Sequence, residues 1–457
     1  MIAASDWMRV LSLQDYNTRL VVLGTAVLGA AAGLIGVYTL LRRRALMGDA
    51  ISHATWPGIA GAYLIYQSVA DVGSVSKPHG WLLLGATITG LLGMATVVAI
   101  NRLTKLKEDA ALGIALSVFF GGGVALRGIV QQIRGGSAAG LESFIYGKTA
   151  SMTVVDLYWI IGASAVVFVA ALLLRKEWTL LCFDAGFAGS EGYPTLALDG
   201  LLMAAVTAVS IVGLQAVGLI LMIALLVIPP AAARFWTDDL TRLLYISIAV
   251  GAVSGCSGAI ASAVYPNLPS GAMIVLCAAS MFGISLLIAP ARGLIPRHWR
   301  RRHLNRVISH QHLLRAMYEA QEERTDDVVT FDELIGARSW STRALRRAIA
   351  ASIGDGWIIE VPGQTTSGSA LQLTRRGFAE AARLTREHRL WELYLITHAD
   401  VAPAKVDRQA DRIEHVVEPE ILADLRSMLG ETESPMLPSP HMVGPESGDG
   451  TDHRVRT

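Results

Sequence analysis

The sequence predicts a mainly α-helical protein, in which a polytopic helical membrane domain precedes a soluble winged-helix domain. Hydrophobic residues make up 52% of the 457 residues and charged residues only 17%, which is too apolar for an average soluble protein. Charged residues are also unevenly distributed along the chain. They are sparse in residues 20–290, whereas residues 291–457 are rich in Arg, Glu and Asp. The second half shows the helix and strand pattern of a winged helix-turn-helix.

About nine segments are apolar enough to span a membrane, with eight as the alternative. A spanning helix needs roughly 20 apolar residues. The clear candidates are 20–41, 81–101, 111–130, 156–175, 243–264 and 270–289. Segment 57–72 is shorter, and the run 198–236 is long enough for two spans that break near Gly213–Gly218. The second of these spans is expected to end at Pro229-Pro230.

Basic residues orient the spans, because Lys and Arg are retained on the cytoplasmic side of a membrane. The basic runs are Arg42–Arg44, Arg102–Lys107, Arg175-Lys176 and Arg297–Arg306. Nine spans with the N-terminus outside place every one of these runs in the cytoplasm. We therefore expect a membrane domain at 1–295, a basic juxtamembrane linker at 296–307 that contacts lipid headgroups, and a cytoplasmic C-terminal part.

The most informative polar residues of the apolar half are Asp49 and His53. They are four residues apart, so a helix places them on one face. A carboxylate and an imidazole together can hold a divalent transition-metal ion. Acidic groups inside a membrane are costly and usually functional. The alternative is a helix N-terminal acid beside a packed histidine.

Two other kinds of chemistry are not indicated by the sequence. The sequence contains no GxxxxGK[ST] motif, so we expect neither a bound nucleotide nor an enzymatic activity in this chain. The three cysteines, Cys182, Cys256 and Cys277, are scattered through the apolar half, which argues against a disulfide framework or a cysteine metal site.

Residues 308–377 are predicted to form the winged helix-turn-helix. The expected elements are helices at 308–322, 331–337 and 341–353 and strands at 357–361 and 369–373. Arg343, Arg346 and Arg347 lie on the second helix of the pair, where side chains touch DNA phosphates in domains of this kind. A domain tied to a bilayer would reach DNA awkwardly, so DNA stays an open partner.

A helical segment is expected at 378–445, before a disordered tail at 446–457. Asp411, Glu414 and His415 have i, i+3 and i+4 spacing on its second helix, and His388 and Glu392 have i, i+4 spacing on its first. Oxygen and nitrogen ligands without a thiolate suit Mn²⁺ or Fe²⁺ and can take Zn²⁺. The alternative is a solvated helical face.

The apolar half resembles the metal-ion permease subunits of ABC importers, which include manganese, zinc and iron permeases. The resemblance covers roughly residues 20–290. The motifs that carry it, in order, are Leu46–Ala54 with Pro57-Gly58, Lys107–Gly113, Leu141–Gly147, Phe183-Asp184 with Ala188 and Gly192, Val217–Arg234, and Pro269–Gly271.

This resemblance implies a permease subunit of the bacterial inner membrane that imports divalent transition-metal ions, manganese first and zinc or iron next. Asp49 and His53 would line its pathway. The connecting segment 178–194, with Asp184, Ala188 and Gly192, would couple it to a separate ATPase chain. The other implied partners are an extracytoplasmic metal-binding protein, a second permease copy or paralogue, and membrane lipids.

The soluble half resembles the diphtheria-toxin-repressor and manganese-transport-regulator family over roughly residues 308–445. The matching motifs are Leu371–Thr374 with Gly377, Glu387–Leu390 with Glu392, Ala410–Val416, and Pro440-His441. The resemblance implies a metal-binding and dimerisation segment whose ligands are His388, Glu392, Asp411, Glu414 and His415. His312 would complete the site from the first helix, where the family often has Met or Asp.

Two other functions remain as alternatives at this stage. One is a membrane-anchored, metal-dependent transcriptional regulator, for which a single span would suffice. The other is an ion-coupled transporter that needs no ATPase.

Overall fold

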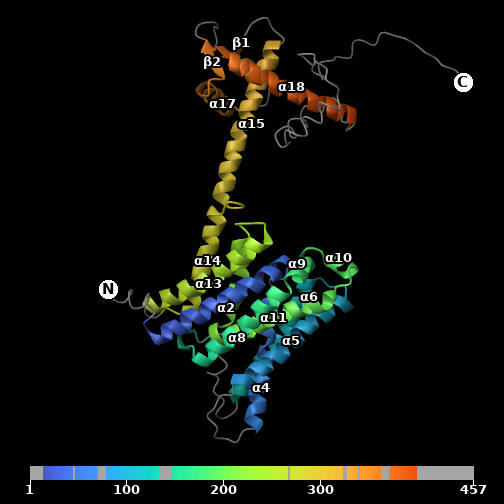
Figure 1. Ribbon diagram of the computed structural model, residues 1–457, viewed down its shortest axis with the longest axis vertical. Coiled ribbons are helices and arrows are strands. Elements are labelled where there is room, and N and C mark those ends of the chain that lie inside the picture. The colour runs from blue at the N-terminus through green and yellow to red at the C-terminus, as the bar shows by residue number, and fades with distance from the viewer. Residues whose placement is uncertain are drawn as a thin grey trace, which may run out of the picture. The chain divides into compact units, whose positions relative to one another are not determined.

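The computed structural model describes residues 14–44, 47–69, 79–132, 147, 149–265, 268–322, 327–337, 340–361 and 370–398. Two compact units make up the chain, Met1–Arg297 and His298–Thr457. Helices dominate both units, which confirms the predicted mainly α-helical fold (Figure 1).

In the part of the first unit that the structure describes, the regular elements are all helices. They are α2 (Tyr16–Leu41), α3 (Met47–Ala54), α4 (Trp56–Val69), α5 (His79–Leu103), α6 (Glu108–Gln132), the 3₁₀ turn η1 (Thr149–Ser151), α8 (Val154–Leu173), α9 (Arg175–Phe183), α10 (Ala185–Ser190), α11 (Thr195–Val217), α12 (Leu219–Ala233), α13 (Leu240–Val264) and α14 (Ser270–Ile288).

Each segment predicted as a membrane span is helical. Among the described residues, seven helices are long and apolar enough to cross a membrane, namely α2, α5, α6, α8, α11, α13 and α14. The remaining two of the nine predicted spans correspond to shorter helices, α4 with 14 residues and α12 with 15. The predicted break near Gly213–Gly218 lies at Gly218, whose φ of 86° ends α11 and favours glycine.

The helix that carries Asp49 and His53 begins earlier than the predicted span at 57–72. The N–H of Thr55 donates to the carbonyl of Ile51 (3.1 Å), and the N–H of Ile59 donates to that of Thr55 (3.0 Å). Hydrogen bonding therefore continues from α3 into α4, past Pro57, whose missing N–H removes a single bond. The polar pair consequently belongs to a helix instead of the loop before one.

The expectation that Pro229-Pro230 ends the second half of the run 198–236 was wrong. Both prolines lie inside α12, which continues to Ala233. A proline leaves the carbonyl four residues before it without its helical partner. The backbone of Gly36 packs against one such carbonyl, that of Leu226, so closely that a Cβ at residue 36 would overlap it. Such close Cα–H contacts help a membrane helix to tolerate proline.

Helices α2 and α13 pack backbone to backbone. Gly29 and Gly251 face each other so closely that a Cβ on either would overlap the carbonyl oxygen of the other. Two hydrogen bonds flank this contact, from Thr25 Oγ1 to the carbonyl of Gly255 (3.1 Å) and from Ser247 Oγ to that of Gly33 (2.7 Å). Small residues permit this approach, which dispersion and hydrogen bonds stabilise in a membrane.

The second unit contains a winged helix-turn-helix, as predicted. Its elements are α15 (Leu294–Glu322), β1 (Val328–Thr330), α16 (Phe331–Ala337), α17 (Thr342–Gly354), β2 (Ile358–Val361), β3 (Ala370–Leu373) and α18 (Arg375–His398). The three strands form an antiparallel sheet in the order β1-β3-β2, with Val329 opposite Leu371 and Ile359 opposite Gln372. Leu313, Met317, Leu345, Ile358 and Leu371 belong to its core.

Two features of the second unit differ from expectation. Strand β1 was not predicted, and the basic stretch 296–307, expected as a linker, is part of the continuous helix α15. The second helix expected within 378–445, on which Asp411, Glu414 and His415 were placed, and the tail at 446–457 lie outside the described residues.

The α2–α13 contact predicts opposite effects for two glycine substitutions. We expect Gly251→Ala to destabilise the membrane unit by about 1–3 kcal/mol, because its methyl group has no space beside Gly29. Gly162→Ala in α8 meets no atom within 4 Å and should be neutral or slightly stabilising, since alanine favours a helix. Thermal unfolding of the purified protein in detergent measures both. Equal melting temperatures for the two variants would contradict the close packing.

Candidate functional site

Asp49 and His53 lie together on α3, as their spacing predicts. Nε2 of His53 is 3.3 Å from Oδ1 of Asp49, and the two side chains keep 19% and 29% of their surface exposed. The ring of His53 also packs edge-on against Phe120 of α6, with the ring centroids 4.8 Å apart. The imidazole is therefore held between a carboxylate and an aromatic ring.

This pair has the chemistry of a transient metal site. Nδ1 of His53 is buried and has no hydrogen-bond partner among the described residues. The nearby hydroxyls are used within the helix, since Ser52 Oγ donates to the carbonyl of Gly48 and Thr55 Oγ1 to that of Ser52. No group of three His, Cys, Asp or Glu residues in the described part of the chain is placed to hold a metal. Two ligands bind an ion weakly, which suits a site that must release it.

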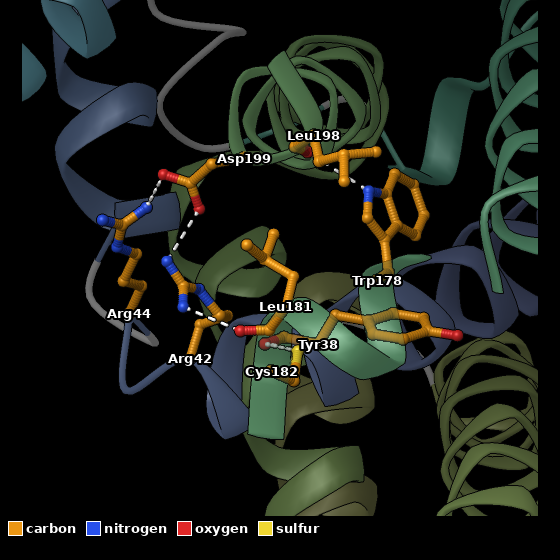
Figure 2. A network of polar contacts seen from close by, with 8 residues as sticks. All are labelled: Tyr38, Arg42, Arg44, Trp178, Leu181, Cys182, Leu198 and Asp199. Atoms are coloured by element: carbon orange, nitrogen blue, oxygen red, sulfur yellow. Dashed lines mark hydrogen bonds and ion pairs between the residues drawn. The ribbon is translucent and has the colours of Figure 1, made fainter. Parts of the chain in front are cut away.

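A network of charged groups lies at the turn between α2 and α3 (Figure 2). Nη2 of Arg42 is 3.2 Å from Oδ1 of Asp199 in α11, and Nη1 of Arg44 contacts Oδ2 of the same carboxylate. Nη1 of Arg42 also donates to the carbonyl of Leu181 in α9 (2.9 Å). The three charged side chains keep only 14–18% of their surface exposed. One carboxylate therefore joins the α2–α3 turn to α11, and Arg42 extends the connection to α9.

From the sequence, Arg42–Arg44 was interpreted only as a signal of membrane orientation, and no role was predicted for Asp199. The available signal was an acidic residue at the beginning of the apolar run 198–236, where burial of an unpaired charge is costly.

Apolar and polar contacts hold α9 beside α2 and α11. Trp178 is fully buried, donates from Nε1 to the carbonyl of Leu198 (3.2 Å) and packs edge-on against Tyr38 at 5.3 Å. The Cys182 thiol faces the carbonyl of Tyr38 (Figure 2). Burial raises the pKa of Cys182 to about 12, so this thiol stays protonated and unreactive near neutral pH.

The connecting segment 178–194 forms most of α9, α10 and the turn into α11. Each of its three predicted coupling residues has a structural role. Asp184 caps α10 by accepting from the N–H of Phe187 (2.8 Å), Ala188 is fully buried, and Gly192 has a φ of 84°. Phe183, which belongs to the motif that carries the permease resemblance, is 69% exposed, and Phe187, which no motif included, is 52% exposed. Aromatic side chains are enriched at protein–protein interfaces compared with the rest of a protein surface.

In the second unit, the predicted DNA-contacting arginines lie on α17 and are exposed. The guanidinium of Arg346 stacks over the ring of Phe331 at 5.6 Å, and Nε of Arg347 donates to the carbonyl of Arg343 (3.1 Å).

His388 and Glu392 of the predicted regulatory site are brought together and buried. Nε2 of His388 is 3.3 Å from Oε1 of Glu392. Arg315 of α15, itself 2% exposed, contacts Nδ1 of His388. A guanidinium only donates, so Nδ1 accepts and the ring proton lies on Nε2, toward Glu392.

The described residues alone do not form a complete metal site in the second unit. His312 lies in α15, but His312, His388 and Glu392 do not make a three-ligand group. The cation of Arg315 beside His388 also disfavours a second cation there. The remaining predicted ligands, Asp411, Glu414 and His415, lie outside the described residues.

Comparison with known proteins identifies the family of the first unit. The profile of the ABC 3 transport family matches residues 14–289, more than half of the chain. The chain belongs to the ABC 3 transport family. The profile named "iron dependent repressor, metal binding and dimerisation domain" matches residues 374–440, a range that includes His388 and Glu392.

Individual relatives of this ABC 3 family member are metal transport proteins. The manganese transport system membrane protein MntC of Bacillus subtilis (strain 168) is 36% identical over 398 residues, which cover 87% of this chain and 88% of that protein. The zinc transport system membrane protein TroC of Treponema pallidum (strain Nichols) is 40% identical over 291 residues, 64% of this chain and 95% of that protein.

A solved structure supports the fold of the membrane unit. PsaBC from Streptococcus pneumoniae in complex with Fab superposes with a TM-score of 0.55 at 28% identity, covering 66% of this chain and all of that one. With the seven apolar helices, these matches establish a multi-pass membrane protein with the permease fold of metal transporters.

Proposed function

We propose that this chain is the permease subunit of an ABC importer that moves divalent transition-metal ions across the plasma membrane. Manganese is the first choice of ion, and zinc or iron is next. The observation that carries the proposal is the Asp49–His53 pair, because its imidazole is oriented by a carboxylate 3.3 Å away within a mostly apolar helical unit. The manganese and zinc transport proteins among the relatives support the class of ion.

The proposed ion pathway uses the two ligands for brief binding only. A divalent cation would replace the proton between the carboxylate and the imidazole, so neutral His53 and ionised Asp49 are the forms that bind it. The described residues of one chain supply too few ligands to complete the coordination of such an ion. We infer that a second permease copy or a paralogue contributes the others, which fits the partly exposed position of both side chains.

The energy for transport would come from a separate ATPase chain. The exposed Phe183 and Phe187, on the firmly held α9–α10 segment, offer a suitable docking surface for it. The basic ends of α2 and α5 would orient this side toward the cytoplasm under the positive-inside rule, and the basic run Arg297–Arg306 would make the C-terminal unit cytoplasmic as well. An extracytoplasmic metal-binding protein would deliver the ion to the opposite face.

The C-terminal unit would sense the same ion in the cytoplasm and regulate transport. Its proposed ligands are His312, His388, Glu392, Asp411, Glu414 and His415. The exposed arginines of α17 support the alternative of a membrane-anchored transcriptional regulator. A membrane anchor needs only one span, however, and the described residues contain seven candidate spans.

The transport proposal predicts that uptake depends on both pathway ligands. In vesicles that hold this chain with its ATPase, we expect ⁵⁴Mn²⁺ uptake to require ATP. Asp49→Asn and His53→Ala should each lower it about tenfold or more, since ~1.4 kcal/mol of lost interaction is a factor of ten. The matched control is His298→Ala, which replaces an exposed histidine in α15 and should transport normally. Uptake without ATP, or uptake indifferent to His53, would argue for a different transporter class.

The sensing proposal predicts metal binding that survives loss of the pathway ligands. In the full-length Asp49→Asn, His53→Ala background, titration with Mn²⁺ should still detect a site. Adding Glu414→Ala or His415→Ala should abolish it, because each removes a proposed ligand. Glu360→Ala, in exposed β2, is the control that keeps the site. Unchanged binding after both ligand substitutions would rule out this metal site.

A further inference from the structure

The carboxylate of Asp199 is the point at which three separate segments of the membrane unit meet. Its Oδ1 faces Arg42, and its Oδ2 faces Arg44, so both oxygens are engaged (Figure 2). Asp199 lies in the second turn of α11, while both arginines belong to the turn between α2 and α3. Arg42 also donates to the carbonyl of Leu181, in the last turn of α9, where helix carbonyls lack an intrahelical partner.

The turn that carries the two arginines is tightly fixed. Arg43 has a φ of 59°, and the N–H of Arg44 donates back to the carbonyl of Thr39 (2.8 Å). The N–H of Met47 then donates to the carbonyl of Arg44 (3.0 Å), which starts α3 directly after the turn. Because Met47 at the start of α3 is hydrogen-bonded to Arg44, the position of Arg44 bears directly on the helix that carries Asp49 and His53.

The other end of the network is attached to the segment proposed to contact the ATPase. Buried Trp178 binds α9 to the carbonyl of Leu198, the residue before Asp199. From Leu181 only three residues lead to Asp184, which caps α10 beside the exposed Phe183 and Phe187. A displacement of α9–α10 would therefore act directly on Arg42 through the carbonyl of Leu181, and on the start of α11 through the carbonyl of Leu198.

We propose that Asp199 is a positioning residue that couples movement of α9–α10 to α3. Arg42 connects Asp199 to α9, and Arg44 connects it to α3. The inference rests on the proposed function as an ATP-driven permease, and it names the residues through which ATP hydrolysis would reach the metal pathway. Asp199 touches no substrate. It acts by holding Arg44 and the start of α3 in a fixed position relative to α9, so that these segments move together.

A merely structural role for the network predicts a different result. If the ion pairs only stabilised the fold, their loss would lower the amount of assembled transporter, and ATP hydrolysis and uptake would fall together. If the network couples the two segments, the assembled transporter would still hydrolyse ATP but would move fewer ions for each ATP. The ratio of ions transported to ATP hydrolysed therefore separates the two roles.

The experiment measures this ratio in vesicles containing the full chain, its ATPase and its extracytoplasmic binding protein, with ⁵⁴Mn²⁺ as the probe. The variants are Asp199→Asn, which removes the shared charge, and Arg44→Gln, which leaves the Arg42–Asp199 pair. We expect each to lower the ratio about fivefold or more, the lower end of typical coupling between sites. Arg44→Lys keeps the charge and should restore part of the ratio.

The matched control is Asp238→Asn, which breaks the exposed Arg292–Asp238 ion pair and should leave the ratio unchanged. An unchanged ratio in Asp199→Asn and Arg44→Gln would overturn the inference, as would loss of assembled transporter in both variants. Absence of ATP-dependent uptake by the unmodified protein would instead overturn the proposed function, so the two failures are distinguishable.

Discussion

The carboxylate of Asp199 sets the geometry of the charged end of the membrane unit. It is mostly buried and shared by two arginines, and burying three charged groups is favourable only when they compensate one another. That requirement fixes the end of α2, the start of α3 and the N-terminal part of α11 relative to one another. Arg42 adds the end of α9 to this group through the carbonyl of Leu181. The position of Asp49 and His53 on α3 depends on where this turn is held.

The helices of the membrane unit differ in how much of their surface is buried. Within their most apolar stretches, 72% of the residues of α2 and of α11 are buried, compared with 28% in α5 and 22% in α6. The backbone contact of α2 with α13 makes α2 a rigid centre. Helix α3 joins this centre to α6, whose Phe120 packs on His53. The Asp49–His53 pair thus lies where a mostly buried helix meets helices that expose much of their surface.

Features set by local sequence were predictable, whereas long-range contacts were not. The i, i+4 spacing of Asp49 and His53 determines their shared face, and the alternation of helix, turn and strand identified the winged helix-turn-helix. Strand β1 has only three residues and is defined by its pairing with β3. A segment this short has no local sequence pattern that predicts a strand. Arg42 and Asp199 are 157 residues apart, and the prolines of α12 are accommodated by Gly36 of another helix. Such contacts arise from tertiary packing, which one sequence does not reveal.

The most direct test is the distance between spin labels at exposed Arg43 and Ser190, in a variant without its native cysteines. It is measured by double electron–electron resonance in the assembled transporter, without nucleotide and with ATP bound. If Asp199 joins the α2–α3 turn to α9–α10, this distance stays constant between the two states, and it changes with nucleotide once Asp199→Asn is introduced. A distance that shifts with ATP equally in the presence and absence of the Asp199 carboxylate would contradict the coupling.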